Sequence, residues 1–246
     1  MTATVSALWR YPIKAVGREA VDSVDLIAGE TFPGDRLWAV AHEKSQAVDG
    51  EWSRCVGFIR GASSPLLQAV TLRQSDGLLH LSHPDRPELS VDPDADPQAL
   101  LDWLRPLIAE RRAAPVRVVR APAGRGMTDT SDPTITLAGR ASLDALSERA
   151  EQTLSMHRWR SNIWIDGTAP WEEFDWVGRP VRIGEAVVEP FCRVDRCQMT
   201  AVNPETGVRD MNTLGLLKDF GHQDFSVGVR VTQGGTVRPG DAVVPA

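Results

Sequence analysis

Cysteines and long apolar runs are scarce in this chain of 246 residues, and each scarcity excludes a class of protein. Three cysteines, an odd number, are too few for a disulfide framework, so reduced thiols are expected. The chain has no run of about 18 apolar residues, which argues against a membrane-spanning helix or a membrane partner. The N-terminus lacks the basic and apolar regions of a signal peptide. The expected location is the cytoplasm.

Positive charge is also in deficit, because 27 Lys and Arg residues stand against 33 Asp and Glu residues. General affinity for nucleic acids comes mainly from basic side chains that neutralise phosphates, so no nucleic-acid partner is expected. An anionic ligand would need a local basic cluster, since the overall field of the protein is negative.

Short apolar runs separated by Gly and Pro are what the chain does contain. Residues 19–27 alternate apolar and acidic side chains, which predicts a half-buried strand. Runs at 66–73 and 78–81 flank a turn at 74–77 and predict a hairpin. Many short strands with frequent turns favour a mainly β fold, either a barrel or a sandwich.

A few helices interrupt this β pattern. Asp96 followed by Pro97 is typical of a helix start. Ser142 is a possible cap for a second helix, and a third is predicted over 212–220 with its end at Gly221.

Charged side chains stand at the entrances of several predicted strands. Loops held there by a rigid scaffold are where barrels and sandwiches present ligand sites. The sequence words are YPIK at 11–14, GDRLWAV at 34–40, RWRSN at 158–162, DRC at 195–197 and NPETG at 203–207. Four basic residues among them would suit a phosphorylated ligand, because Arg offers bidentate contacts and Lys a point charge. They are Lys14, Arg36, Arg158 and Arg160.

In order and spacing, these words resemble the MOSC family, which is named for the C-terminal domain of molybdenum-cofactor sulfurases. YPIK and GDRLWAV resemble its usual N-terminal β-barrel partner, whereas WRSNIWIDG, PWEEFDW and DRCQMTAVNPETG resemble the MOSC domain itself. The resemblance covers nearly the whole chain. It implies an N-terminal β-barrel domain over 1–120 and a MOSC β-barrel domain over 121–246, with a cofactor between them. The arrangement is similar to the amidoxime-reducing molybdoenzymes of mitochondria and their bacterial relatives, which carry a pyranopterin molybdenum cofactor.

The resemblance also implies roles for individual residues. Cys197 corresponds to the cysteine whose thiolate ligates molybdenum, and a soft thiolate suits that metal. Asp129 corresponds to a loop near the metal and is a candidate catalytic group in a proton relay. Ser161 replaces the proline of the family's Arg-Pro-Asn word. Five residues are expected on this basis to bind the cofactor: Lys14, Arg36, Arg160, Asn162 and Arg196. Arg158 is expected to bind it as a further member of the basic cluster.

The function that the resemblance implies is that of an oxidoreductase, independent of pyridoxal phosphate, that reduces small N-hydroxylated or other N–O or S–O compounds. No cysteine-rich segment for an iron–sulfur cluster occurs before the chain ends at Ala246. A separate protein is therefore expected to donate the electrons.

Other interpretations of the same residues stay open. Cys197 could carry a persulfide in sulfur transfer, because Arg196 beside it is a cation of the kind that favours a thiolate. The protein could also bind the cofactor without turnover, as a carrier or sensor. A lone cysteine is otherwise typical of a small buried side chain. Arg36 could simply pair with Asp35 at the surface.

Overall fold

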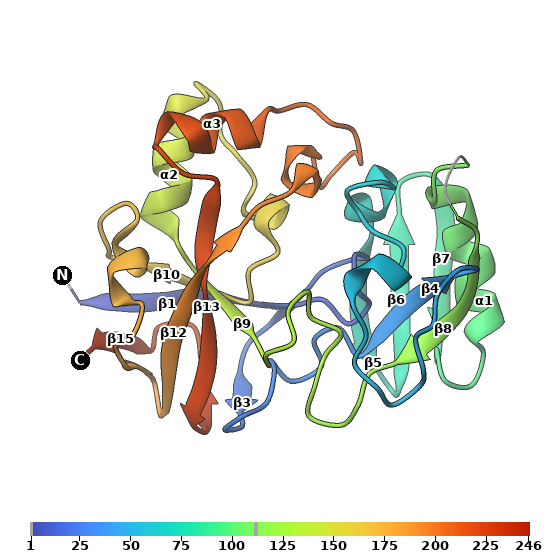
Figure 1. The fold of residues 1–246 in the computed structure, drawn as a ribbon, viewed down its shortest axis with the longest axis horizontal. Coiled ribbons are helices and arrows are strands. Elements are labelled where there is room, and N and C mark those ends of the chain that lie inside the picture. Colours follow the sequence, from blue (N-terminus) through green and yellow to red (C-terminus); the bar gives the residue numbers. More distant parts are fainter. Residues whose placement is uncertain (1, 111–112) are drawn as a thin grey trace.

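The computed structural model of the protein describes residues 2–110 and 113–246. Figure 1 shows two groups of strands side by side along the long axis, and the chain begins and ends in the larger group. We call the larger group the barrel. The smaller group, formed by strands and a helix between residues 38 and 120, is the small lobe. The mainly β fold with a few helices that the sequence predicts is confirmed.

Pairing between strands far apart in the sequence closes the barrel. Its strands are β1 (Ala3–Arg10), β2 (Glu19–Val21), β9 (Ile135–Gly139), β10 (Ile163–Asp166), β11 (Val181–Ile183), β12 (Ala186–Asp195), β13 (Asp224–Gln233) and β15 (Ala242–Pro245). In the described part of the chain they form one sheet in the order β10-β9-β13-β12-β11-β15-β1-β2, with a further pairing of β10 to β1. That pairing closes the sheet into a ring, from which β2 extends.

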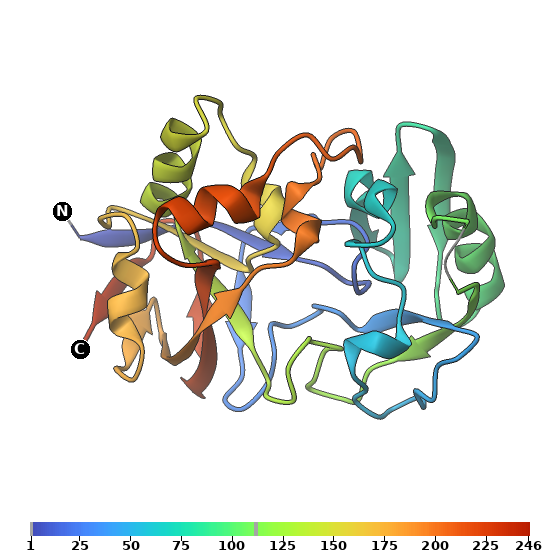
Figure 2. The same cartoon turned by 45° about the horizontal axis from the view of Figure 1, so that its top comes forward.

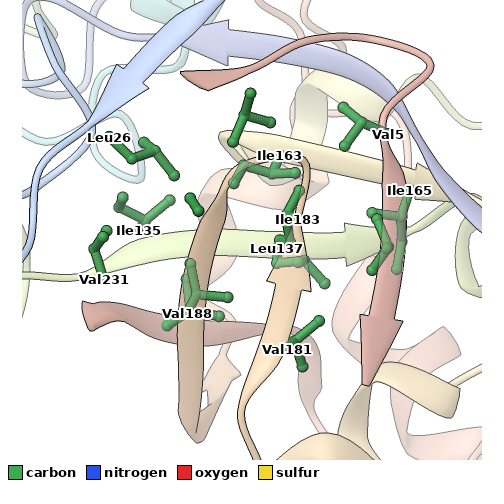
Figure 3. Close-up of a cluster of buried hydrophobic side chains, with 14 of the residues drawn as sticks. Val5, Leu26, Ile135, Leu137, Ile163, Ile165, Val181, Ile183, Val188 and Val231 are labelled. Atoms are coloured by element: carbon green, nitrogen blue, oxygen red, sulfur yellow. The ribbon is translucent and has the colours of Figure 1, made fainter. Parts of the chain in front are cut away.

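Branched aliphatic side chains fill the inside of the barrel. Leu137, Ile163 and Val188 come from three different strands and are fully buried. Figure 3 shows them among the side chains that gather between the strands. Successive residues of a strand face opposite sides, so alternate positions supply this core. Each such fully buried side chain contributes about 1.5–3 kcal/mol relative to an exposed one.

Strands from the start of the chain belong to the barrel. β1 pairs with β10 and β15 within the barrel sheet. β3 (Val24–Leu26) pairs with β14 (Gly235–Val237) in a separate two-stranded sheet, whose side chains join the same buried cluster. Strands from both sides of residue 120 therefore share one sheet. The division into domains at 1–120 and 121–246 stays a prediction.

The small lobe has its own strands and its own buried core. They are β4 (Trp38–His42), β5 (Thr71–Ser75), β6 (Leu78–His83), β7 (Arg86–Val91) and β8 (Pro115–Arg120), with helix α1 (Pro97–Leu104). β4 pairs with β8, and β5, β6 and β7 form a separate sheet. The predicted hairpin is present as β5 and β6. Asp76 and Gly77 between them both have positive φ, as a tight two-residue hairpin turn requires.

The strand predicted over 66–73 begins later than expected. Pro65–Ala69 form a 3₁₀ helix, and β5 starts only at Thr71. Pro65 favours the first turn of a helix, because its ring fixes φ and its nitrogen has no hydrogen to donate. The turn buries the consecutive residues Leu67 and Gln68, which the alternation of a strand would place on opposite faces.

Two of the predicted helix boundaries are confirmed. Asp96 caps α1 by accepting a hydrogen bond from the backbone N–H of Ala99 at 3.0 Å. Gly221, with φ of +84°, lies two residues beyond the end of α3 (Thr213–Asp219). Together with α2 (Arg140–Arg149), these helices appear with the strands in the view of Figure 2. None of the helices in residues 2–110 and 113–246 combines the length and apolar character needed to cross a membrane.

Ser142 does not cap the second helix, contrary to expectation. Helix α2 (Arg140–Arg149) begins after Gly139, so Ser142 lies inside its first turn and is fully buried. The side chain of Glu173 takes the capping role, because it accepts hydrogen bonds from the Gly139 N–H at 3.2 Å and the Ser142 hydroxyl at 2.9 Å. The capping group is remote in sequence, so a local pattern could not identify it.

Truncation of a barrel side chain should test the closed core. Leu137→Ala should lower the free energy of unfolding by about 3 kcal/mol, because it removes buried methyl groups and leaves a cavity. Val244→Ala is the control, since Val244 lies on a strand of the same barrel but is 38% exposed; its effect should be below about 0.5 kcal/mol. Urea unfolding measures both. Equal losses would contradict the observed packing.

Candidate functional site

Charged side chains from separate loops meet where the chain passes between the barrel and the small lobe. The loops follow β1, precede β4, precede β9, precede β10 and follow β12. Residues on the first four are linked directly, because Tyr11 contacts Arg36 and Arg160, and Lys14 contacts Asp129. The structure therefore brings together Lys14, Arg36, Asp129 and Arg160, as the sequence analysis expects of one site.

Lys14 is a buried cation with two oxygen partners. Its ammonium group donates to the carbonyl of Met127 at 2.8 Å and forms an ion pair with Asp129. Burial lowers the pKa of Lys14, although the Asp129 charge acts in the opposite direction. The Asp129 side chain itself is 75% exposed. Desolvation raises the pKa of Asp129, but the nearby positive charges, Lys14 first, outweigh this effect and lower it.

Arg160 is the least satisfied cation of the site. It is 8% exposed, and its Nη1 donates to the carbonyl of Gly17 at 2.7 Å. Its Nη2 is buried without a hydrogen-bond partner among the described residues. Burial, together with the charge of Arg36, lowers the pKa of Arg160 to about 10. A buried guanidinium with a free donor is an arrangement that an anion would complete.

Arg36 does pair with Asp35, but not at the surface. Asp35 is 1% exposed and the Arg36 side chain 15% exposed. Burial acts to lower the pKa of Arg36, and the adjacent Asp35 charge outweighs it and raises the pKa. Asp35 also accepts a hydrogen bond from the Tyr11 N–H at 2.7 Å. The ion pair therefore belongs to the buried wall of the site.

Arg158 and Arg196 donate hydrogen bonds to other groups of the protein. Arg158 donates to a carboxylate oxygen of Asp210 at 2.7 Å. Arg196 donates to the carbonyls of Trp159 and Phe225, both at 2.9 Å. Burial lowers the pKa of Arg196 to about 10, while the neighbouring Cys197 acts to raise it. These contacts hold the loops together, and a contact of either arginine with a cofactor stays a prediction.

Asn162 lies in the wall of the barrel and is fully buried. Its Oδ1 accepts hydrogen bonds from the backbone N–H and the hydroxyl of Thr136, at 3.1 and 3.0 Å. Its Nδ2 donates to the carbonyl of Trp9 at 3.2 Å. The amide thus ties the start of β10 to β9 and β1, a role that the sequence analysis missed. Its contact with a cofactor stays a prediction.

Cys197 is exposed, unlike a small buried core residue. It directly follows β12 and precedes the 3₁₀ helix Gln198–Ala201, and its carbonyl accepts from the Thr200 hydroxyl at 3.1 Å. Cys192 is half-buried, and burial raises the pKa of its thiol. Of these two thiols, Cys197 is thus the more accessible to a ligand or metal.

Several residues in or beside the site have unfavourable, positive backbone φ angles. Among the described non-glycine residues, seven have positive φ, and four of them are in or beside the site: Ala15, Arg36, Arg160 and Ser226. Ser226 accepts a hydrogen bond from Arg196, and Ala15 follows Lys14. Such conformations cost on the order of 1–3 kcal/mol each and persist where the surroundings impose them, often at functional sites.

Tyr11, Arg18 and Asp35 also belong to this buried network, although the sequence analysis gave Tyr11 and Arg18 no role and expected Asp35 only as a surface partner of Arg36. Arg18 donates to the carbonyls of Gln68 and Pro204, both at 3.0 Å, and pairs with Glu205 at 2.8 Å. These partners are 50 or more residues away along the chain. No local pattern could indicate them. Tyr11 and Asp35 lie within the sequence motifs YPIK and GDRLWAV. Their closeness in sequence to Lys14 and Arg36 was the one signal that could have marked them as site residues.

Comparison with known protein families identifies two matches along this chain. Residues 2–104 match the MOSC N-terminal beta barrel domain, and residues 125–244 match the MOSC domain. The residues of the site fall in both: Lys14 and Arg36 in the first, Asp129, Arg160 and Cys197 in the second.

Among curated proteins, the chain is similar to mitochondrial amidoxime reducing component 2 of Bos taurus, with 26% identity over 84% of this chain and 68% of that protein. It is similar to mitochondrial amidoxime-reducing component 1 of Mus musculus, with 24% identity over 98% of this chain and 81% of that protein. A shorter likeness, 33% identical over 39% of this chain and 12% of the relative, is to molybdenum cofactor sulfurase of Drosophila grimshawi.

Removal of the Asn162 amide should destabilise the barrel. Asn162→Ala removes a fully buried amide and leaves the half-buried Thr136 N–H without its side-chain acceptor, so the free energy of unfolding should fall by about 3 kcal/mol. Asn203→Ala is the control, because Asn203 makes only exposed turn and side-chain hydrogen bonds; its cost should be below about 1 kcal/mol. Urea unfolding measures both, and a small loss for Asn162→Ala would refute the structural role.

Acid should weaken the fold through His157. Its ring packs edge-on against Trp9 at 4.3 Å, and burial lowers its pKa from 6.5 to about 4. Below pH 6.5 the unfolded chain takes up the proton before the folded one does, so stability falls as the pH drops from 6.5 to 4 and then levels off. The loss attributable to His157 should be about 3 kcal/mol, because one pKa unit corresponds to about 1.4 kcal/mol.

The pH test compares two histidine variants by urea unfolding at several pH values. His157→Gln should abolish most of this loss, because the titrating group is gone. His80→Gln should retain it, since the imidazole of His80 lies on β6 against serine hydroxyls. An unchanged pH dependence in His157→Gln would show that another group causes the acid sensitivity.

Proposed function

This chain is a MOSC-domain protein with an N-terminal MOSC β-barrel domain, and from that premise we propose that it binds a molybdenum cofactor and reduces small N-hydroxylated or other N–O or S–O compounds. Its relatives include proteins named as amidoxime reducing components and as a molybdenum cofactor sulfurase. The observation that carries the proposal is the free, buried Nη2 of Arg160, which lies within a cluster of cations.

The residues present fit a phosphorylated, metal-bearing cofactor. Lys14, Arg36 and Arg160 carry three positive charges against the two carboxylates of Asp35 and Asp129, so the cluster retains a net positive charge. Lys14 would offer a point charge and the arginines planar donors to a phosphate.

The exposed thiol of Cys197 is tied to the cation cluster through its neighbour in sequence. Arg196, which precedes Cys197, donates to the carbonyl of Trp159, the residue before Arg160, at 2.9 Å. A thiolate would be a suitable protein ligand for molybdenum already held by sulfur atoms of the pterin.

When bound, the cofactor supplies the oxygen-accepting and electron-transferring chemistry that no protein side chain offers. The chain's own residues bind and orient it. Arg36 and Arg160 would hold its phosphate, and Cys197 would set the position of the metal. The carboxylate of Asp129, which pairs with Lys14 and is 75% exposed, would pass protons between solvent and the site. Asp129 thus has a catalytic role in the proposal, and Lys14 holds its carboxylate in place.

Electrons would come from a separate donor protein, and no nucleic acid or membrane is part of the proposed reaction. A cytoplasmic location remains part of the proposal.

Metal analysis of the full chain, produced in a host that makes the cofactor, tests the proposal. The protein should contain molybdenum, and Cys197→Ala should lose more than about 100-fold of the activity with a chemical reductant and an N-hydroxylated substrate. Cys192→Ala is the matched control, because it removes the half-buried thiol of the same segment and should retain metal and activity. Full activity of Cys197→Ala would remove the metal-ligand assignment.

A second candidate function is sulfur transfer, which the exposure of Cys197 beside Arg196 favours. It predicts one additional sulfur atom on Cys197 in the mass spectrum of the intact protein, and no molybdenum. Bound molybdenum without activity toward any donor and substrate would instead indicate a cofactor carrier.

A further inference from the structure

Tyr11 is the single tyrosine of the chain, and it lies at the centre of the cation cluster. Its side chain is almost fully buried, at 1% exposure. The guanidinium carbon of Arg160 lies 4.1 Å from the centre of the phenol ring, and that of Arg36 lies 5.6 Å from it. Both distances are within the range of cation–π attraction.

Three hydrogen bonds fix this ring relative to both arginines. The phenol hydroxyl donates to the carbonyl of Ser161, the residue after Arg160, at 3.1 Å. The Tyr11 N–H donates to Asp35 at 2.7 Å, and the Tyr11 carbonyl accepts from the Arg36 N–H at 2.8 Å. Tyr11 is therefore anchored both to the loop of Arg160 and to the loop of Arg36.

Two guanidinium groups on one ring repel each other. The charge of Arg36 is one cause of the lowered pKa of Arg160. Asp35 pairs directly with Arg36, whereas Arg160 has no carboxylate partner among the described residues. The electron-rich face of an aromatic ring can offset part of this repulsion without occupying a hydrogen-bond donor. Arg160 thus keeps its Nη2 free.

We propose that Tyr11 is a positioning residue, which holds Arg36 and Arg160 so that both can bind one phosphate group. The inference rests on the proposed function, in which that phosphate belongs to the cofactor. Burial raises the pKa of Tyr11 above its usual range, so the phenol stays neutral and adds no competing negative charge. A leucine would fill the space without attracting either guanidinium, and a phenylalanine would keep the attraction but lose the hydroxyl anchor.

Inorganic phosphate is the probe for the first test, with the full chain produced in a host that cannot make the cofactor. Tyr11→Leu should weaken phosphate binding about tenfold, and Tyr11→Phe by no more than about threefold, because it keeps the ring. Phe191→Leu is the matched control: Arg230 lies over Phe191 at the same 4.1 Å, and neither residue belongs to the cluster. It should bind phosphate as the wild type does.

A second measurement needs no variant at Tyr11. Because the chain has one tyrosine, incorporation of 3-fluorotyrosine gives a single ¹⁹F resonance that reports on this ring. Phosphate should shift that resonance in the wild-type chain, and Arg160→Ala should lose most of the shift. Sodium chloride at the same ionic strength should change the resonance little, and this control separates phosphate binding from general screening of charge.

Two results would overturn the inference: equal phosphate affinity of Tyr11→Leu and wild type, or a ¹⁹F resonance that does not respond to phosphate at any concentration. The metal analysis described above separates this inference from the proposed function. Loss of phosphate binding in Tyr11→Leu, together with a chain that never contains molybdenum, would support the positioning role and reject the molybdoenzyme.

Discussion

The pairing of β1 with β10 is the constraint on which the site depends. Leu8 of β1 lies opposite Ile163 of β10, although 155 residues separate them. The pairing closes the barrel, and it also places the loop after β1 beside the loop before β10. Tyr11 and Arg160 can meet only because these two loops leave adjacent strands at the same end. One set of backbone hydrogen bonds therefore supports both the core and the cation cluster.

The cost of burying charge explains much of the local structure around the site. Ionised groups away from water require partners, and Lys14 and Arg36 have carboxylates for this purpose. Among the described residues, Arg160 depends on a single carbonyl and an aromatic ring. This unequal satisfaction makes Arg160 the position at which an anionic ligand would gain most. The positive φ values of Arg36 and Arg160 indicate that the fold imposes their placement.

The small lobe reaches the site through a few specific contacts. Trp52 donates from its indole to the carbonyl of Thr128 at 3.1 Å, and Arg125 lies over its ring. Arg18 links the small lobe, through Gln68, to the loop of Pro204 and Glu205. These contacts hold the loop of Asp129 and the loop after Cys197 against the rest of the protein.

Short-range interactions are the part of the structure that the sequence by itself determined. Asp96 caps α1 three residues away, and Asp76 and Gly77 turn β5 into β6, because the partners in each case are close along the chain. The sequence words also identified most of the charged residues that meet at the site. The roles expected of these charged residues follow from their residue types and from the family motifs that they resemble.

Only the tertiary structure decided how those residues are used. Asn162 serves the barrel wall, Glu173 caps α2 in place of Ser142, and Tyr11 joins two arginines. Each of these roles depends on groups that come together only after distant strands pair. A buried polar group takes whichever partner the closed barrel provides, and its neighbours in sequence do not reveal that partner.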